Sequence, residues 1–389
     1  MKQSFSVGID IGSATTRVVV SSAPITPGGL PQVIAHSAVE TRGCKHGYVL
    51  QREDVTTTLK KALREAETQA GIKIKQATIA IGGVGLQADY AMGTAVVSRA
   101  DSIIGKLDIE KAITEAEGTL DLKNRAILHA YPVVFKIDGK EHPVRPEGIQ
   151  GLKLEVKVLF VTCFQQHIDD LLGVLQDAGV RVLGFTATPL ATHHLLLTDL
   201  QRNFGCALID VGAETVSVSV FENNIPTSLH VFGIGSLDIT KDIALGLRIT
   251  PEEAESVKRG SVSFQSIPKK KLDEIIEARL SDIFELIDKY LKKIGRSGLL
   301  PAGAVLIGGG AYSTQIEAVA KTMLKIPVKL GALDIPSIKG PIKDQRLITA
   351  YAVSLPKNEL GGKKNRTPDT NDNEGFVAVI KNFFKQLMP

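Results

Sequence analysis

The sequence of 389 residues has few cysteines and little excess of either charge. Its three cysteines, Cys44, Cys163 and Cys206, are far apart and form no Cys-x-x-Cys pair, so neither a disulfide framework nor a zinc site is predicted. We expect buried thiols in a reducing cytoplasm. The formal net charge is only +4, and no cluster of Lys and Arg is interleaved with aromatic residues. Nucleic acid is therefore not an expected partner.

Long apolar runs are also missing. No stretch approaches the roughly 18 residues that cross a bilayer. The first residues lead directly into an apolar strand pattern, so we expect no signal peptide. A length of 389 residues exceeds what one ordinary core supports, and 43% of the residues are hydrophobic. Two or more domains are expected, and any membrane contact should be peripheral.

One short pattern occurs twice, at 9–20 and 209–220. Each copy is an apolar run, a turn with one carboxylate and one glycine, and a second run rich in β-branched residues, which predicts a β-hairpin. The shared positions are Asp10, Gly12 and Thr15 in the first copy and Asp210, Gly212 and Thr215 in the second. Glycine lets backbone N–H groups approach an anion, hydroxyls add donors, and carboxylates hold a divalent cation through water. Two facing copies predict a phosphate clamp.

Between the two copies, the pattern predicts a compact α+β insertion in the first domain. It predicts a strand at 77–82, a helix at 108–118 and an alternating strand at 152–161, with a loop rich in Gly and Pro before the last strand. Further elements follow on both sides of the second copy. They are helices at 169–177, 239–247, 251–258, 272–294 and 347–353, a strand at 180–185 and a helix after Pro189. Thr188 and Thr250 are the predicted N-caps of helices that begin with proline.

A glycine run ends the buried strand predicted at 305–311, and a helix is expected from Ser313. Bare backbone at such a junction lets a flat ligand lie against a helix N-terminus. The alternative is a tight connection without a ligand.

The composition changes after residue 356. Residues 357–374 lose their apolar side chains, as in a disordered tether, and 375–389 then form an amphipathic helical pattern. Its apolar face carries Phe376, Ile380, Phe383, Phe384 and Leu387, and the opposite face carries Lys381, Asn382, Lys385 and Gln386. Large aromatics rimmed by lysines favour an anchor at the bilayer interface. A docking helix is the alternative.

Several passages resemble the FtsA family of bacterial cell-division proteins, over nearly the whole chain. Residues 235–247 resemble its "GGxxITxDIAxGL" block, and residues 252–258 resemble its "EEAExxK". Residues 145–156 resemble the "DPxGMxGxxLExxV" of its insertion, and residues 272–287 resemble its "LxxIIEPRxxEIFELI". Residues 380–385 resemble its membrane-targeting helix. The resemblance implies an α/β fold, the duplicated actin-like (ribonuclease H-like) ATPase fold with an α+β insertion subdomain.

The resemblance also implies a division of the chain. Subdomain 1A would cover 1–77, 162–203 and 345–356, and the insertion, called subdomain 1C, would cover 78–161. Subdomain 2A would cover 204–235 and 299–344, and subdomain 2B would cover 236–298. The linker would cover 357–374, and the membrane-targeting helix 375–389.

ATP and Mg²⁺ are the implied ligands, bound between the two halves. The first phosphate loop would be Asp10, Gly12, Ser13, Ala14 and Thr15, and the second Asp210, Gly212, Ala213, Glu214 and Thr215. Asp10 and Asp210 would orient the metal, and Glu255 and Lys258 would reach the ribose and adenine. The adenosine would pack on Gly308, Gly309, Gly310 and Ala311.

The implied role is that of a peripheral membrane protein on the cytoplasmic face of the cell membrane, at the division site. It would anchor FtsZ filaments and self-associate into filaments. The FtsZ C-terminal peptide would contact Arg279, Lys270 and Lys271, and the insertion would bind later division proteins. Phe376, Ile380, Lys381, Phe383, Phe384, Lys385 and Leu387 would meet the lipid.

One departure concerns the second loop, which in the family normally has the sequence "DIGGGTTD". Ala213 and Glu214 stand where glycines are expected. The Cβ of Ala213 would narrow the approach to the phosphates, and the Glu214 carboxylate would lie beside like charge unless it turns outward or meets the metal. We expect weak nucleotide binding and slow or absent hydrolysis.

Three alternatives share the superfold. A pilus-assembly adaptor generally lacks the tethered C-terminal helix. A small-molecule kinase would need a catalytic Asp or His beside a substrate pocket, and no such constellation stands out. A chaperone ATPase would need a substrate domain after about residue 350, which we do not expect here.

Overall fold

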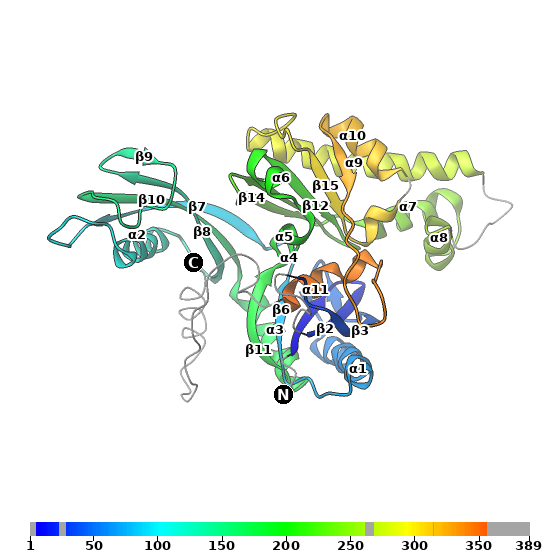
Figure 1. The fold of residues 1–389 in the computed structure, drawn as a ribbon. Coiled ribbons are helices and arrows are strands. Elements are labelled where there is room, and N and C mark those ends of the chain that lie inside the picture. Colours follow the sequence, from blue (N-terminus) through cyan, green and yellow to red (C-terminus); the bar gives the residue numbers. More distant parts are fainter. Residues whose placement is uncertain (1–4, 23–28, 261–267, 314, 356–389) are drawn as a thin grey trace.

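The computed structural model describes residues 5–22, 29–260, 268–313 and 315–355 (Figure 1). The predicted linker at 357–374 and the amphipathic segment at 375–389 lie outside these residues. The described chain forms two five-stranded sheets with covering helices, a separate four-stranded sheet covered by one helix, and a small two-stranded sheet. No helix in this part of the chain combines the length and the hydropathy that a membrane crossing requires.

The first sheet has the strand order β11-β6-β1-β2-β3. Its strands are β1 (Phe5–Ile11), β2 (Thr15–Ser22), β3 (Val33–Glu40), β6 (Gln76–Ile81) and β11 (Arg181–Ala187). Helices α1 (Arg52–Ala70) and α3 (Gln165–Asp177) pack on it, and α11 (Ile348–Ser354) crosses β1 closely. A Cβ on Gly8 would lie 2.0 Å from the Ala350 carbonyl oxygen, so only glycine permits this contact between strand and helix.

The second sheet repeats the plan of the first, with the order β14-β13-β12-β15-β16. Its strands are β12 (Cys206–Val211), β13 (Val216–Glu222), β14 (Ile225–Phe232), β15 (Ala304–Ile307) and β16 (Val328–Leu330). In each sheet an antiparallel hairpin is followed by a parallel neighbour, β6 beside β1 and β15 beside β12. The two hairpins have the same strand register: Asp10 lies opposite Arg17 in the first, and Asp210 lies opposite Ser217, at the corresponding position, in the second. This confirms the duplication predicted from the repeated pattern.

Four helices belong to the second half of the molecule: α7 (Ser236–Leu247), α8 (Pro251–Lys258), α9 (Lys269–Lys293) and α10 (Ile316–Leu324). The predicted cap of α8 is confirmed. Thr250 Oγ1 accepts the Glu253 N–H at 3.2 Å, and the Glu253 carboxylate accepts the Thr250 N–H at 2.8 Å. This reciprocal pair is a capping box, and it fixes where α8 begins.

The insertion forms a sheet in the order β7-β10-β8-β9. It contains β7 (Gln87–Val96), β8 (Arg125–Ile137), β9 (Lys140–His142), β10 (Lys153–Phe164) and the helix α2 (Lys106–Gly118). Figure 1 shows it projecting from the rest of the molecule. It touches the second half where the Tyr90 hydroxyl donates to the Thr227 carbonyl at 2.6 Å.

Placing the strand at 77–82 in the insertion was wrong. This strand is β6, which pairs in parallel with both β1 and β11 in the first sheet. Ala77, Ile79, Ala80 and Ile81 are all buried, because a central parallel strand is covered on both faces. The sheet of the insertion therefore begins at Gln87, and a boundary at residue 78 is too early.

Two predicted helix starts also need correction. Thr188 is the first residue of the short helix α4 (Thr188–Ala191), and no side chain caps it. The chain then passes through α5 (His193–Leu196) and α6 (Asp199–Phe204). After the glycine run, a 3₁₀ turn covers Gly309–Tyr312, and α10 begins only at Ile316. Gly308, at φ +92° and ψ 169°, precedes this 3₁₀ turn directly, so the turn takes the place of the predicted start of the α-helix.

Candidate functional site

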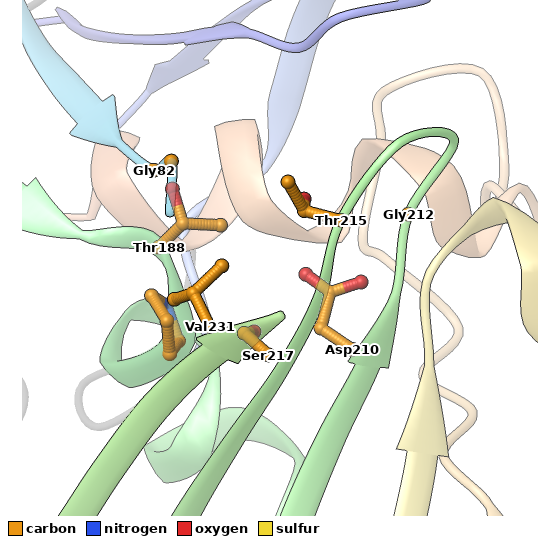
Figure 2. A pocket seen from close by; sticks show the side chains of 9 residues that line it. Gly82, Thr188, Asp210, Gly212, Thr215, Ser217 and Val231 are labelled. Carbon is orange, nitrogen blue, oxygen red and sulfur yellow. The ribbon is translucent and has the colours of Figure 1, made fainter. Parts of the chain in front are cut away.

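A small cavity lies between the turn of the second repeated hairpin and the chain that follows β6 and β11 in the first half of the molecule. Figure 2 shows Gly82 and Thr188 on one side and Asp210 and Thr215 on the other. Its lining includes Gly82, Gly83, Thr188, Pro189, Asp210, Gly212, Thr215 and Ser217. The empty space, which includes part of the solvent at its mouth, is about 270 Å³. This space is too small to enclose a nucleotide.

The first turn carries one ion pair. Arg17 Nη1 lies 3.2 Å from Asp10 Oδ2, and the two side chains are only 16% and 13% exposed. Arg17 Nη1 also donates to the Thr15 carbonyl at 3.3 Å, and the Gly12 N–H closes the turn onto the same oxygen at 3.1 Å. Burial raises the pKa of Asp10 although the Arg17 guanidinium acts in the opposite direction.

The second turn has the same backbone bond but a different charge balance. The Gly212 N–H donates to the Thr215 carbonyl at 2.8 Å. Burial and the nearby negative charge of Asp10 raise the pKa of Asp210 to about 6. The structure thus brings Asp10 and Asp210 into one electrostatic environment, as the repeat predicted, with Arg17 as a cation that stabilises both carboxylates.

The tip of the second turn is tied to the start of α7. The N–H groups of Ser236 and Leu237 donate to the carbonyls of Gly212 and Ala213 at 2.9 and 2.8 Å. A Cβ on Gly235 would lie 2.4 Å from the Ala213 carbonyl oxygen, so this approach needs glycine. Ala213 is therefore held firmly, and its Cβ has a fixed place in the turn.

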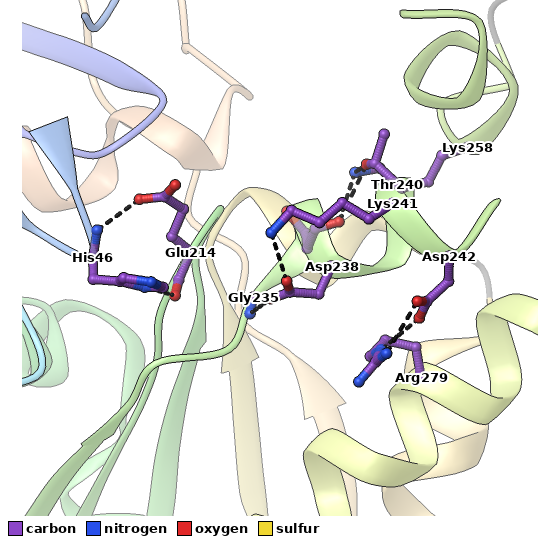
Figure 3. Close-up of polar contacts among 10 residues, drawn as sticks. His46, Glu214, Gly235, Asp238, Thr240, Lys241, Asp242, Lys258 and Arg279 are labelled. Atoms are coloured by element: carbon purple, nitrogen blue, oxygen red, sulfur yellow. Dashed lines mark hydrogen bonds and ion pairs between the residues drawn. The ribbon is translucent and has the colours of Figure 1, made fainter. Parts of the chain in front are cut away.

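Glu214 reaches across to the first half of the molecule (Figure 3). Its Oε2 accepts the His46 backbone N–H at 2.6 Å, and its carbonyl oxygen lies 3.0 Å from His46 Nδ1. The adjoining Gly47 N–H donates to Ser13 Oγ at 2.9 Å. His46 and Gly47 connect β4 (Cys44–Lys45) to β5 (Tyr48–Val49), so one two-residue loop contacts both repeated turns.

Glu255 and Lys258 lie together on α8, as their spacing predicted. Lys258 Nζ is 2.7 Å from Glu255 Oε2, and it also donates to the Ser236 carbonyl at 3.0 Å and to Thr240 Oγ1 at 2.7 Å. Burial lowers the pKa of Lys258. Burial opposes ionisation of Glu255 as well, but the hydrogen bonds from Lys258 and Thr240 outweigh it and leave the pKa of Glu255 lowered. The two side chains form a preformed polar pair.

The members of the glycine run differ in their surroundings. A Cβ on Gly308 would lie 2.2 Å from Asp210 Oδ1, and one on Gly310 would lie 2.6 Å from Val211 Cγ1. These two glycines are needed for packing against the second hairpin. A Cβ on Gly309 would have only Arg346 Cδ nearby, at 4.0 Å. Gly309 therefore presents open backbone, whereas Gly310 and Ala311 are buried.

Of the three predicted partner contacts, one already has partners within the protein. Arg279 donates to both oxygens of Asp242 at 2.5 and 3.0 Å and lies 3.4 Å from Asp282 (Figure 3). It thereby joins α9 to α7. Lys270 is 90% exposed, with Glu274 at 3.9 Å, and Lys271 is exposed beside it.

Sequence reasoning missed Arg17, His46 and Thr240. Arg17 could have been found by comparing the two copies of the pattern, because it stands where the second copy has Ser217. His46 carries no local signal, since its contact with Glu214 spans 168 positions. Thr240 could have been found, because it lies in the block at 235–247 that resembles the family. All three cysteines are free thiols, and Cys163 and Cys206 are buried. Within the described residues, no group of three or more His, Cys, Asp or Glu could hold a metal ion.

Comparison with known proteins identifies relatives along most of the chain. The family model "Cell division protein FtsA" matches residues 207–352, and the model "SHS2 domain inserted in FTSA" matches 87–162. The cell division protein FtsA of Bacillus subtilis (strain 168) is 27% identical over 86% of this chain and 80% of its own length. FtsA of Pseudomonas aeruginosa is 28% identical over 86% and 84%. FtsA of Escherichia coli (strain K12) is 24% identical over 98% and 96%.

Solved structures share the fold at lower identity. The PilM-PilN type IV pilus biogenesis complex aligns with a TM-score of 0.69 and 17% identity, over 92% of this chain and 99% of the other. MreB5 of Spiroplasma citri bound to AMPPNP aligns with a TM-score of 0.50 and 12% identity, over 90% and 95%. These likenesses confirm the actin-like α/β fold with its inserted subdomain.

Proposed function

Because this chain belongs to the FtsA family of cell-division proteins, we propose that it anchors FtsZ filaments to the cytoplasmic face of the membrane at the division site. It does so as an ATP-binding protein that self-associates into filaments. The two hairpins with matching registers bring Asp10 close enough for its charge to raise the pKa of Asp210, and this is the observation that supports the nucleotide site. The match to the FtsA family supports the division role.

Mg²⁺ fits the chemistry of Asp10 and Asp210. Both carboxyl groups have raised pKa values because they are buried, and the charge of Asp10 adds to the effect at Asp210. A divalent cation near both would relieve that repulsion. Mg²⁺ usually takes one or two carboxylates together with phosphate oxygens and waters, so a site of only two acidic residues is sufficient. The bound ion would neutralise phosphate charge.

The remaining nucleotide contacts come from both halves. In the proposal, the turn residues Gly12 to Thr15 and Gly212 to Thr215 donate N–H and hydroxyl groups to the phosphates. The polar pair of Glu255 and Lys258 exchanges part of its hydrogen bonding for the ribose and adenine. The open backbone of Gly309 takes the flat face of the adenosine.

Hydrolysis is proposed to be slow or absent, so ATP acts chiefly as an assembly ligand. Ala213 is held in place by Leu237 and Gly235, and its Cβ cannot move aside for a terminal phosphate. A ligand shifts a conformational equilibrium by binding one state better than another, without being consumed. ATP can therefore promote filament assembly here with little turnover.

The partner surfaces are proposed from three regions. The segment at 375–389 meets lipid through its aromatic side chains and lysines, a pattern taken from the sequence. Lys270 and Lys271, exposed on α9, receive the acidic C-terminal peptide of FtsZ. The insertion, starting after β6, binds later division proteins or a neighbouring protomer. Arg279, which is 28% exposed and also joins α7 to α9, is the third proposed contact of the peptide.

Co-sedimentation of FtsZ with lipid vesicles tests this function. The full chain should pellet FtsZ with anionic vesicles, and more so with ATP, whereas a chain lacking 375–389 should leave FtsZ in the supernatant. The double variant K270E/K271E should remain on the vesicles but lose FtsZ. The control variant K289E/K293E reverses two exposed charges at the other end of α9 and should retain it. Vesicle binding without FtsZ recruitment by the full chain would contradict the proposal.

A further inference from the structure

The Glu214 carboxylate accepts a hydrogen bond from a backbone N–H group that lies beside the two repeated turns. Its Oε2 accepts the His46 N–H at 2.6 Å, and the Gly47 N–H beside it is taken by Ser13 Oγ at 2.9 Å. His46 and Gly47 both have positive φ, +48° and +85°, which is the conformation of a tight two-residue hairpin loop. Glu214 is therefore an anion already bound to a rigid backbone donor.

The second contact between the same residues makes this a bridge between the halves. His46 Nδ1 lies 3.0 Å from the Glu214 carbonyl oxygen, so His46 contacts both the side chain and the backbone of Glu214. His46 belongs to the first half of the molecule, and Glu214 to the tip of the second hairpin. The second turn and the loop of His46 cannot move apart while both contacts persist.

Comparison of the two turns shows that the carboxylate is an addition to the repeated pattern. Thr15 and Thr215 occupy matching positions, and the residue before each is Ala14 in the first turn and Glu214 in the second. Ala14 contributes only a backbone contact, from its carbonyl oxygen to the Thr41 N–H at 3.0 Å. The repeated turn thus does not require a long acidic side chain at this position.

The electrostatic surroundings disfavour a second anion here. Burial, together with the negative charges of Glu214 and Asp10, raises the pKa of the Cys44 thiol to about 12. The carboxylates of Glu214 and Asp10 therefore both act on the region beside the two repeated turns. Arg17, already paired with Asp10, is the cation that acts on Asp10 and Asp210. A phosphate chain entering this space meets carboxylate charge at both turns.

We propose that Glu214 is an internal competitor of the nucleotide phosphates: its carboxylate closes the cleft onto His46, and a nucleoside triphosphate must displace it to bind. The inference rests on the proposed nucleotide function and assigns a specificity role to one residue of that site. Removing the negative charge should strengthen binding, and removing the whole side chain should also free the loop of His46 and Gly47.

Two measurements on the full chain separate these effects. The first is a calorimetric titration with Mg²⁺-ATP of the unmodified protein, Glu214→Ala, Glu214→Gln and the control Glu141→Gln. Glu141 is a 70% exposed carboxylate on the insertion, so its substitution changes the net charge equally. The second is amide hydrogen exchange at 44–49 in the nucleotide-free proteins.

We expect both Glu214 variants to bind ATP at least tenfold more tightly, and Glu141→Gln to bind as the unmodified protein does. Exchange of the His46 amide should be at least tenfold faster in Glu214→Ala and nearly unchanged in Glu214→Gln, whose amide oxygen still accepts. Equal ATP affinity in all four proteins would overturn the inference and leave the nucleotide site intact. Binding to none of them would overturn the nucleotide function itself, and the inference with it.

Discussion

Arg17 lies directly across the first hairpin from Asp10, with its Nη1 3.2 Å from the carboxylate Oδ2. The matching position in the second hairpin, opposite Asp210, is Ser217. The two halves of the clamp are therefore alike in backbone but unequal in charge. Asp10 has a cation of its own, whereas Asp210 shares that cation at a longer range and has a pKa raised to about 6.

Removal of the Arg17 charge should destabilise the protein in a manner that depends on pH. In Arg17→Ala the buried Asp10 carboxylate loses its partner, and breaking a buried pair costs about 3–5 kcal/mol. Because Arg17 acts to lower the pKa of Asp10, its loss raises that pKa further, and protonation relieves part of the cost at low pH. Urea unfolding should show a larger deficit at pH 8 than at pH 5, and Arg17→Lys should recover most of it. An equal deficit at both pH values would mean that Arg17 contributes by packing alone.

The raised pKa of Asp210 predicts a second pH effect. The folded protein holds this proton up to about pH 6, whereas an unfolded Asp releases it near 3.9. The folded state therefore binds more protons in that window, and the contribution of Asp210 to stability falls as pH rises from about 4 to about 6, by roughly 3 kcal/mol.

Asp210→Asn removes this titration, so its stability relative to the unmodified protein should increase over the same window and then stay level. Unfolding free energies at pH 4, 5, 6 and 7.5 give the difference curve. Asp121→Asn, at a carboxylate that is 72% exposed, is the control and should give a flat difference. A flat difference for Asp210→Asn as well would contradict the raised pKa.

Local patterns predicted much of the fold. The two hairpins, the Thr250 cap and the amphipathic α9 each follow from residues within a few positions of one another, and each is present. The strand at 77–82 was also detected, but its sheet was not. Its partners β1 and β11 lie about 70 positions before it and 100 after it in the chain, and alternation alone cannot distinguish a strand of the insertion from one of the first sheet.

The candidate site was predictable to a similar degree. Asp10, Gly12, Asp210 and Gly212 were found because they repeat, whereas the roles of Glu255, Lys258 and the glycine run at 308–310 were implied by the resemblance to the family. The contact of Glu214 with His46 was not foreseen, since it joins residues 168 positions apart. The sequence indicated only that Glu214 would lie near like charge, and the backbone N–H that stabilises it belongs to a loop with no motif of its own.

The glycine run at 308–310 offers a paired test of packing against ligand contact. Gly308 has φ +92°, and a Cβ there would lie 2.2 Å from Asp210 Oδ1 and 2.5 Å from the Val211 carbonyl oxygen. Gly308→Ala should therefore lower the free energy of unfolding by about 3 kcal/mol, from backbone strain together with the clash.

Gly309→Ala meets only Arg346 Cδ, at 4.0 Å, so its stability should change by less than about 0.5 kcal/mol. Its Cβ would nevertheless stand on the surface proposed for adenosine, and ATP affinity should fall severalfold while the melting temperature is retained. Denaturant melts and ATP titrations of both variants make the comparison; full ATP affinity in Gly309→Ala would mean that the run serves only as a tight connection between β15 and the 3₁₀ turn.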